Sequence, residues 1–69
     1  MKQVEANRYA ASIRGYAEQW TDAQIEEAIA DERRILQSQS LSDVARDNSD
    51  MILNIYLDVL NQRQENSAA

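Results

Sequence analysis

The segment from Met51 to Leu60 constrains the fold more than any other part of this 69-residue chain. Wound as a helix, it spreads its apolar side chains over roughly 240° of its circumference, because successive residues turn by about 100°. A helix that packs on one neighbour needs an apolar stripe of little more than ~100°. We therefore expect the segment either to be the central helix of a small bundle or to meet a second copy of itself. Its apolar residues are Met51, Ile52, Leu53, Ile55, Tyr56, Leu57, Val59 and Leu60.

The composition favours an all-α fold and excludes most enzyme mechanisms. The chain has one Gly and no Pro, so it lacks the residues that hairpins and phosphate-binding loops require. It has no Cys and no His, which removes thiolate nucleophiles, Cys-containing zinc sites and the commonest general base. We predict a protein that is not an enzyme and that has no cofactor and no metal.

Charge and hydropathy narrow the range of partners. Twelve acidic residues against seven basic ones give a net charge of −5, which disfavours binding to nucleic acid. No run approaches the 18 or so apolar residues of a membrane span, and the first residues do not form an apolar signal segment. We expect a cytoplasmic location and no membrane partner.

Capping signals predict that two helices follow one another directly. The first helix is expected from Val4 to Trp20. Thr21 and Gln24 form a capping box, and Trp20 and Ile25 are placed for a hydrophobic staple, so the second helix begins at once and runs over 22–38. This arrangement is an αα corner with almost no loop.

The remainder of the chain is expected to be a short linker, a long helix and a tail. Residues 38–43 are polar and rich in helix-capping residues. The third helix should continue from there to about Gln64, and 65–69 should fray. We predict one all-α domain over 1–69, a compact three-helix unit that forms a homodimer, because a chain of this length is only marginally stable alone.

The first helix carries a narrow stripe, within roughly 120°, that combines aromatic residues with alanines. Core packing is the preferred interpretation. A ring platform that stacks a base is the alternative, but no Arg or Lys accompanies the rings. The stripe consists of Ala6, Tyr9, Ala10, Ile13, Tyr16, Ala17 and Trp20.

Two polar residues interrupt apolar stripes. Glu32 projects from the apolar stripe of the second helix, where a lone carboxylate would be costly. We expect it either to pair with Arg8, Arg14 or Arg46 or to sit where the stripe meets solvent, and a binding role is the alternative. Asn48 falls in the apolar arc of the third helix, where one polar residue can fix the register of paired helices.

A line of acidic and amide side chains occupies the narrow polar strip of the third helix, within about 80°. A solvated face is one explanation, and a docking surface for a basic partner is the other. The line consists of Asp43, Asp47, Asp50, Asn54, Asp58 and Asn61. We consider a metal site here improbable, because one straight helix does not converge its ligands.

Other candidate contacts lie on the first two helices. Arg33 and Arg34 suit a phosphate or carboxylate, or simply salt bridges, and Gly15 leaves a flat spot on the first helix. The predicted partner-binding residues are Asp43, Asp47, Asp50, Asp58, Arg33, Arg34 and Gly15. The predicted dimer interface consists of Asn48, Met51, Ile52, Ile55, Tyr56, Val59 and Leu60.

The segment Ser40-Leu-Ser-Asp-Val-Ala-Arg46, with Asn48-Ser-Asp and Val-Leu-Asn61 after it, resembles the helix-turn-helix of LacI-type repressors. The resemblance covers about a third of the chain and implies a DNA-binding regulator. Two departures argue against this function. The motif has a Gly-containing turn where this chain has 47–50, and its recognition helix is polar where this one is rich in Ile and Leu.

Three functions follow, in order of preference. The first is a non-enzymatic interaction protein that binds and modulates another protein, with inhibition as the expected effect, by analogy with small acidic helical products of phages and mobile elements. The second is an oligomer that binds an anionic ligand such as a nucleotide between protomers, through Arg33, Arg34 and the Tyr/Trp edge. The third is the DNA-binding regulator.

Overall fold

The computed structural model describes the backbone of residues 2–68 and the side chains of residues 7–67. The chain forms three helices, α1 (Lys2–Ala17), α2 (Asp22–Leu36) and α3 (Asp43–Ala68), and no strand among the described residues. The predicted all-α, compact three-helix fold is confirmed. Ala6, which we assigned to the stripe of the first helix, lies outside the described side chains, and Ala69 of the tail lies outside the described residues.

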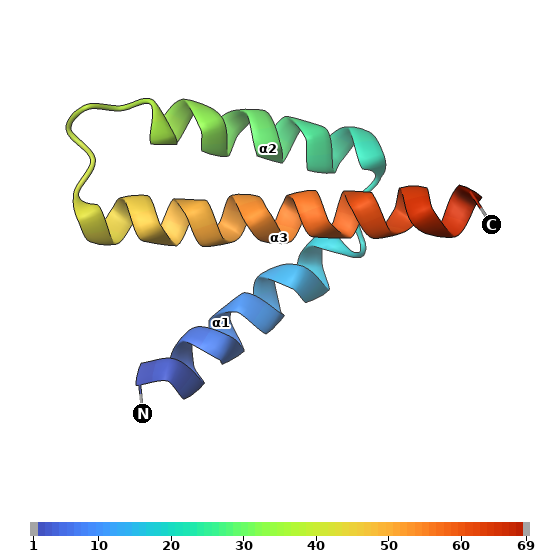
Figure 1. Ribbon diagram of the computed structural model, residues 1–69, viewed down its shortest axis with the longest axis horizontal. Helices are drawn as coiled ribbons and strands as arrows, with labels where there is room; N and C mark the ends of the chain where they lie inside the picture. Colours follow the sequence, from blue (N-terminus) through green and yellow to red (C-terminus); the bar gives the residue numbers. More distant parts are fainter. Residues whose placement is uncertain (1, 69) are drawn as a thin grey trace.

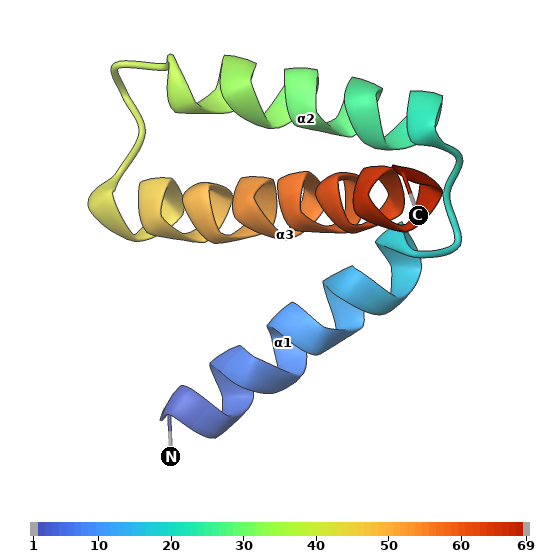
Figure 2. The same cartoon turned by 45° about the vertical axis from the view of Figure 1, so that its right-hand side comes forward.

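The central position predicted for the third helix is confirmed. α2 lies antiparallel along one side of α3, and α1 packs on the other side (Figure 1). α1 crosses α3 obliquely, so that its C-terminal end is close to α3 while its N-terminal end points away (Figures 1 and 2). The result is a flat layer of 41 × 30 × 16 Å. Its radius of gyration is 13.1 Å, about 2 Å above that of a densely packed domain of this length.

The buried core is small. It consists of Ala17 from α1, Ile25 and Ile29 from α2, and Ile55 and Val59 from α3. Each large aliphatic side chain that is fully buried contributes about 1.5–3 kcal/mol. Partly exposed residues pack around these five, namely Ala10, Ile13, Trp20, Met51, Leu53, Tyr56 and Leu60. Stability therefore depends on few side chains.

The capping box at the corner between α1 and α2 forms as predicted, but residues 18–21 connect the two helices where almost no loop was expected. The Thr21 hydroxyl accepts a hydrogen bond from Gln24 N, and the Gln24 side chain accepts one from Thr21 N, which completes the capping box. α1 ends at Ala17 rather than Trp20, because a tight turn follows in which Trp20 N donates to Ala17 O. This turn packs Trp20 against the core that contains Ile25.

The connection from α2 to α3 is held by an arginine. α2 ends at Leu36, two residues before the predicted end. Arg46 of α3 donates to the backbone oxygens of Leu36 and Ser38, at 3.1 and 3.4 Å, and so satisfies carbonyls at the end of α2. Ser42 caps α3, because its hydroxyl accepts a hydrogen bond from Ala45 N.

α3 is longer than predicted and is not interrupted. It extends to Ala68 rather than to Gln64. It also runs continuously through 47–50, where a helix-turn-helix requires its turn. The helix-turn-helix interpretation of 40–61 is therefore wrong. Fraying of the tail stays a prediction.

None of the helices within residues 2–68 combines the length and the apolar character that crossing a bilayer requires.

Candidate functional site

The acidic line of α3 lies on the surface, with one exception. Asp43, Asp47 and Asp50 are exposed, as are Asn54 and Asn61. Asp58 is half-buried and forms an ion pair with Arg14 of α1. Asp58, which we predicted as a partner-binding residue, is therefore already engaged within the chain. This pair was missed because it depends on the angle at which α1 crosses α3.

Asp43, Asp47 and Asp50 are left without cationic partners among the described side chains. The three ion pairs of that part of the chain use other carboxylates, those of Asp22, Asp31 and Asp58. Helical spacing puts Asp43, Asp47 and Asp50 about one turn apart on one side of α3. We call these three residues the acidic row. Like charges at this spacing repel one another, so the row favours a cationic partner.

Aromatic side chains gather on another side of the layer. The rings of Trp20 and Tyr56 are in contact, with centroids 5.7 Å apart. Burial raises the pKa of the Tyr56 hydroxyl, and the nearby Glu32 carboxylate and Tyr9 raise it further, so these groups lie near one another. On α3, Tyr56 lies about 150° around the helix from the acidic row.

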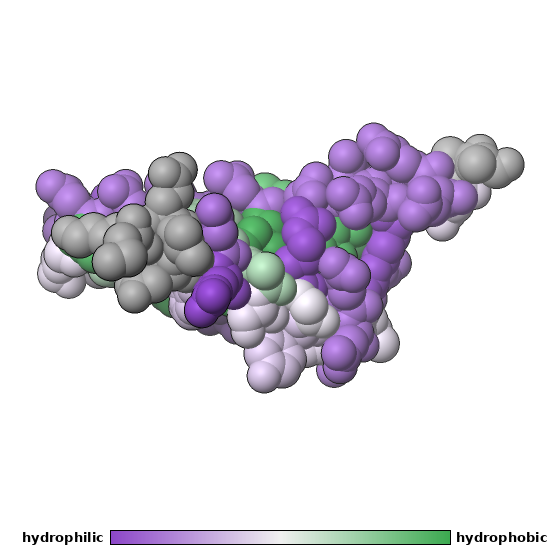
Figure 3. Space-filling view, turned by 90° about the horizontal axis from the view of Figure 1, so that it is seen from below, coloured by the Kyte–Doolittle hydropathy of each residue, from purple (hydrophilic) through white to green (hydrophobic). Residues whose placement is uncertain are grey.

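Two of the aromatic residues predicted to pack in the core are exposed. Tyr9 is 47% exposed and Tyr16 is 64% exposed. Both lie about 80–100° around α1 from the buried Ala17, and the N-terminal part of α1, which carries Tyr9, also diverges from α3. Figure 3 views the molecule from the side of α1 and shows hydrophilic side chains over most of this view, with pale ones of intermediate hydropathy in its lower middle. Sequence periodicity identified the stripe but not the crossing angle that uncovers it.

The prediction that Glu32 pairs with an arginine is wrong. Among the described side chains Glu32 forms no ion pair, since Arg14 pairs with Asp58 and Arg46 binds backbone carbonyls. Glu32 is half-buried beside Tyr56 instead. It adds a negative charge to the aromatic side of the layer.

The other predicted contact residues are exposed. Arg33 lies on the surface, and Arg34 pairs with Asp31 in a solvated (i, i+3) bridge. Gly15 is exposed, and a Cβ placed on it would meet nothing within 4 Å. The backbone is open there, as predicted, and its use by a partner stays a prediction.

The predicted dimer interface is partly used within the chain. Ile55 and Val59 are only 9% and 3% exposed, because α1 and α2 already cover them. Met51, Tyr56 and Leu60 pack at the edge of this core, and Ile52 is half-buried. Asn48, expected within the apolar arc, is exposed.

A recess of about 180 Å³ beside Trp20 bears on the anionic-ligand alternative. Glu27 and Asp31 line it together with Gln24 and Ala28. Two carboxylates next to the ring repel a phosphate, so the charges at Trp20 disfavour a nucleotide there.

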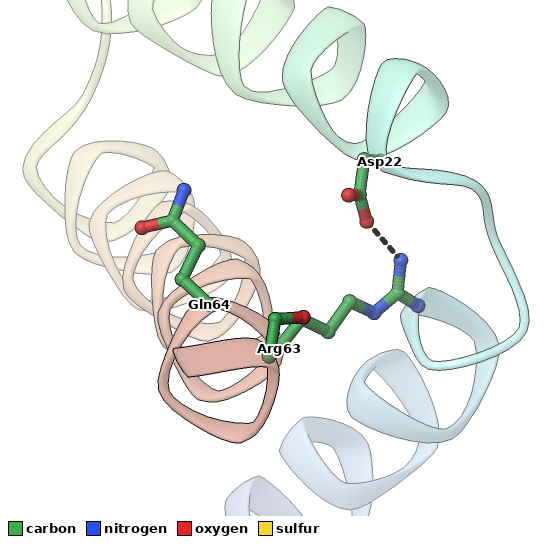
Figure 4. Close-up of a pocket in the computed structure, with 4 residues that line it drawn as sticks. Asp22, Arg63 and Gln64 are labelled. Atoms are coloured by element: carbon green, nitrogen blue, oxygen red, sulfur yellow. Dashed lines mark hydrogen bonds and ion pairs between the residues drawn. The ribbon is translucent and has the colours of Figure 1, made fainter. Parts of the chain in front are cut away.

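A second recess, of about 360 Å³, was not anticipated from the sequence (Figure 4). Arg63 points across it from α3 to Asp22 at the start of α2, with 2.7 Å between Nη1 and Oδ1. Nη2 of Arg63 also donates to the backbone oxygens of Ala17 and Glu18, at 3.3 and 2.9 Å. Arg63 thus joins the ends of all three helices, and its donors are used for structure rather than for a ligand.

Among the described residues, no three carboxylates are grouped so that they could hold a metal ion together. The chain matches no protein-family model, and comparison with curated proteins and with solved structures gives no significant match. Its function is therefore inferred from its own residues.

Proposed function

We propose that this chain is a non-enzymatic interaction protein that binds a basic surface of another protein through the acidic row. The observation that supports this most is that Asp43, Asp47 and Asp50 are all exposed and without cationic partners in the described part of the chain. Complementary charge steers such an encounter and excludes acidic partners. The net charge of −5 adds to the attraction at long range.

The expected effect on the partner is inhibition. Basic protein surfaces commonly bind phosphates or carboxylates. A row of carboxylates held on a rigid helix competes for the same guanidinium and ammonium groups. The protein would thus block the anionic ligand of its partner without any chemistry of its own.

The proposed working form is a homodimer. A chain of 69 residues with five buried apolar side chains among its described residues has little stability in reserve. A second copy would cover apolar side chains that the three helices leave exposed, among them Tyr9, Tyr16 and Ile35.

Charge reversal tests the acidic row. A tagged copy in its own cells would be crosslinked to its partner, the partner identified by mass spectrometry, and the affinity measured with purified components. Asp47→Lys/Asp50→Lys should weaken binding by at least about tenfold, mainly through a slower on-rate. Because both side chains are exposed, the helicity should not change.

The matched control, the α2 variant, is Glu18→Lys/Glu26→Lys, which makes the same change in net charge at exposed positions in α2 and just before it. This control should keep most of the affinity. If the α3 and α2 variants lose affinity equally, only the total charge matters. If the α3 variant binds as well as the wild type, the acidic row is not the binding site.

A further inference from the structure

The chain exposes more surface than a folded protein of its mass normally does. Its accessible surface is 5309 Å². A compact monomer of 7.9 kDa exposes about 4,400 Å². The excess of about 900 Å² is close to the ~800 Å² that each partner buries in a standard protein–protein interface. This surface is the right size for one stable contact.

A set of apolar side chains that are exposed or half-buried marks where that contact lies. Tyr9 and Tyr16 are seven residues apart and so share one side of α1, and Trp20 follows in the turn. Tyr56 contacts Trp20 from α3. On α2, Ala28 lines the recess beside Trp20, and Ile35, 43% exposed, lies two turns later on the same side. We call the aromatic face the set of Tyr9, Tyr16, Trp20, Tyr56 and Ile35.

The composition of this face suits a stable interface. Tyrosine and tryptophan are enriched at the centres of protein–protein interfaces, because each covers much area with few rotatable bonds. The opposite choice, a contact through the acidic row, would bring Asp43, Asp47 and Asp50 of two copies together. Such like-charge contact opposes association through the row. The aromatic face also has carboxylates beside it, those of Glu27, Asp31 and Glu32, so the apolar area of its rings and of Ile35 must outweigh their repulsion when two copies meet.

We propose that two copies of this chain meet through their aromatic faces. This inference rests on the proposed homodimer and names its interface. A two-fold axis would place the aromatic face of one copy against the same face of the other, since two-fold interfaces are self-complementary. Both acidic rows then stay exposed, on the other side of the layers, so the dimer presents two sites to a basic partner. Two linked sites increase avidity for a partner that is itself repeated.

Two substitutions on this face test the interface. The mass of Tyr9→Glu/Tyr16→Glu would be measured by light scattering after size exclusion, beside Ala11→Glu/Ala30→Glu, which adds the same charge at exposed positions elsewhere on α1 and α2. The tyrosine variant should weaken self-association by about 100-fold or more, because carboxylates would be buried, and the alanine variant should remain dimeric. A tyrosine variant that stays a dimer places the interface elsewhere and overturns the proposal.

The single Trp provides a readout that does not depend on a folded variant. Trp20 of the wild type should become less accessible to acrylamide as dilute protein is concentrated through the dimerisation range. A wild-type dimer in which Trp20 is quenched as easily as in the monomer contradicts the aromatic face. A wild type that is monomeric at every concentration instead contradicts the homodimer itself.

Discussion

Single residues differ in importance because the core contains so few of them. Ile25 is fully buried between α2 and α3, whereas Ile35 on the same helix is 43% exposed. Ile25→Ala should lower the free energy of unfolding by about 2–5 kcal/mol, enough to unfold much of a marginal domain. Ile35→Ala is the matched control, measured by urea denaturation at a concentration where the protein is monomeric. Equal losses for the two variants would contradict the described core.

The raised pKa of Tyr56 predicts how the free energy of unfolding changes at alkaline pH. Burial, then Glu32 and Tyr9, raise the pKa of Tyr56 above its ordinary value of about 10. As the pH rises above 10, the unfolded chain loses this proton first, so the free energy of unfolding falls until the pH passes the higher pKa of the folded state. The contribution of Tyr56 to the free energy of unfolding is fully present below pH 10. Tyr56→Phe removes this part of the dependence, and a wild type that parallels Tyr56→Phe from pH 9 to 12 would show that Tyr56 does not titrate abnormally.

At the scale of helices, the sequence allowed the local features to be predicted. The three helices, the capping box at Thr21 and the central place of the third helix all depend on residues close together in the chain or on periodicity. The crossing angle of α1 depends on neither, because contacts between residues far apart in the chain set it. It decides that Tyr9 is exposed, that Asp58 pairs with Arg14, and that Ile55 and Val59 are covered within the chain. Periodicity was therefore enough to predict which residues of α3 lie on its exposed strip, but not which side chains meet at the helix contacts.

The capping box gives a test of the corner. Thr21→Ala removes the hydroxyl that accepts from Gln24 N and should cost about 0.5–2 kcal/mol of unfolding free energy. Thr21→Ser keeps the acceptor and should cost much less. Thermal denaturation of the three proteins at one concentration compares them. A Ser variant as unstable as the Ala variant would mean that the methyl group, and not the cap, stabilises the corner.

At the scale of the whole molecule, the flat layer separates two surfaces with different chemistry. We propose that the acidic row binds a basic partner and that the aromatic face binds a second copy. The layer is thin because only α3 contacts both of the other helices extensively. Association would thus complete a core that 69 residues do not complete alone.

The mass of the wild-type protein in solution tests this account most directly. It would be measured by light scattering coupled to size exclusion over a dilution series, in low and high salt. We predict a dimer of about 16 kDa, twice the 7.9 kDa chain. Added salt should not weaken this dimer, because salt screens the repulsion between the two acidic chains and does not weaken the apolar contact. A mass of 7.9 kDa at all concentrations, with the helices intact, would contradict it.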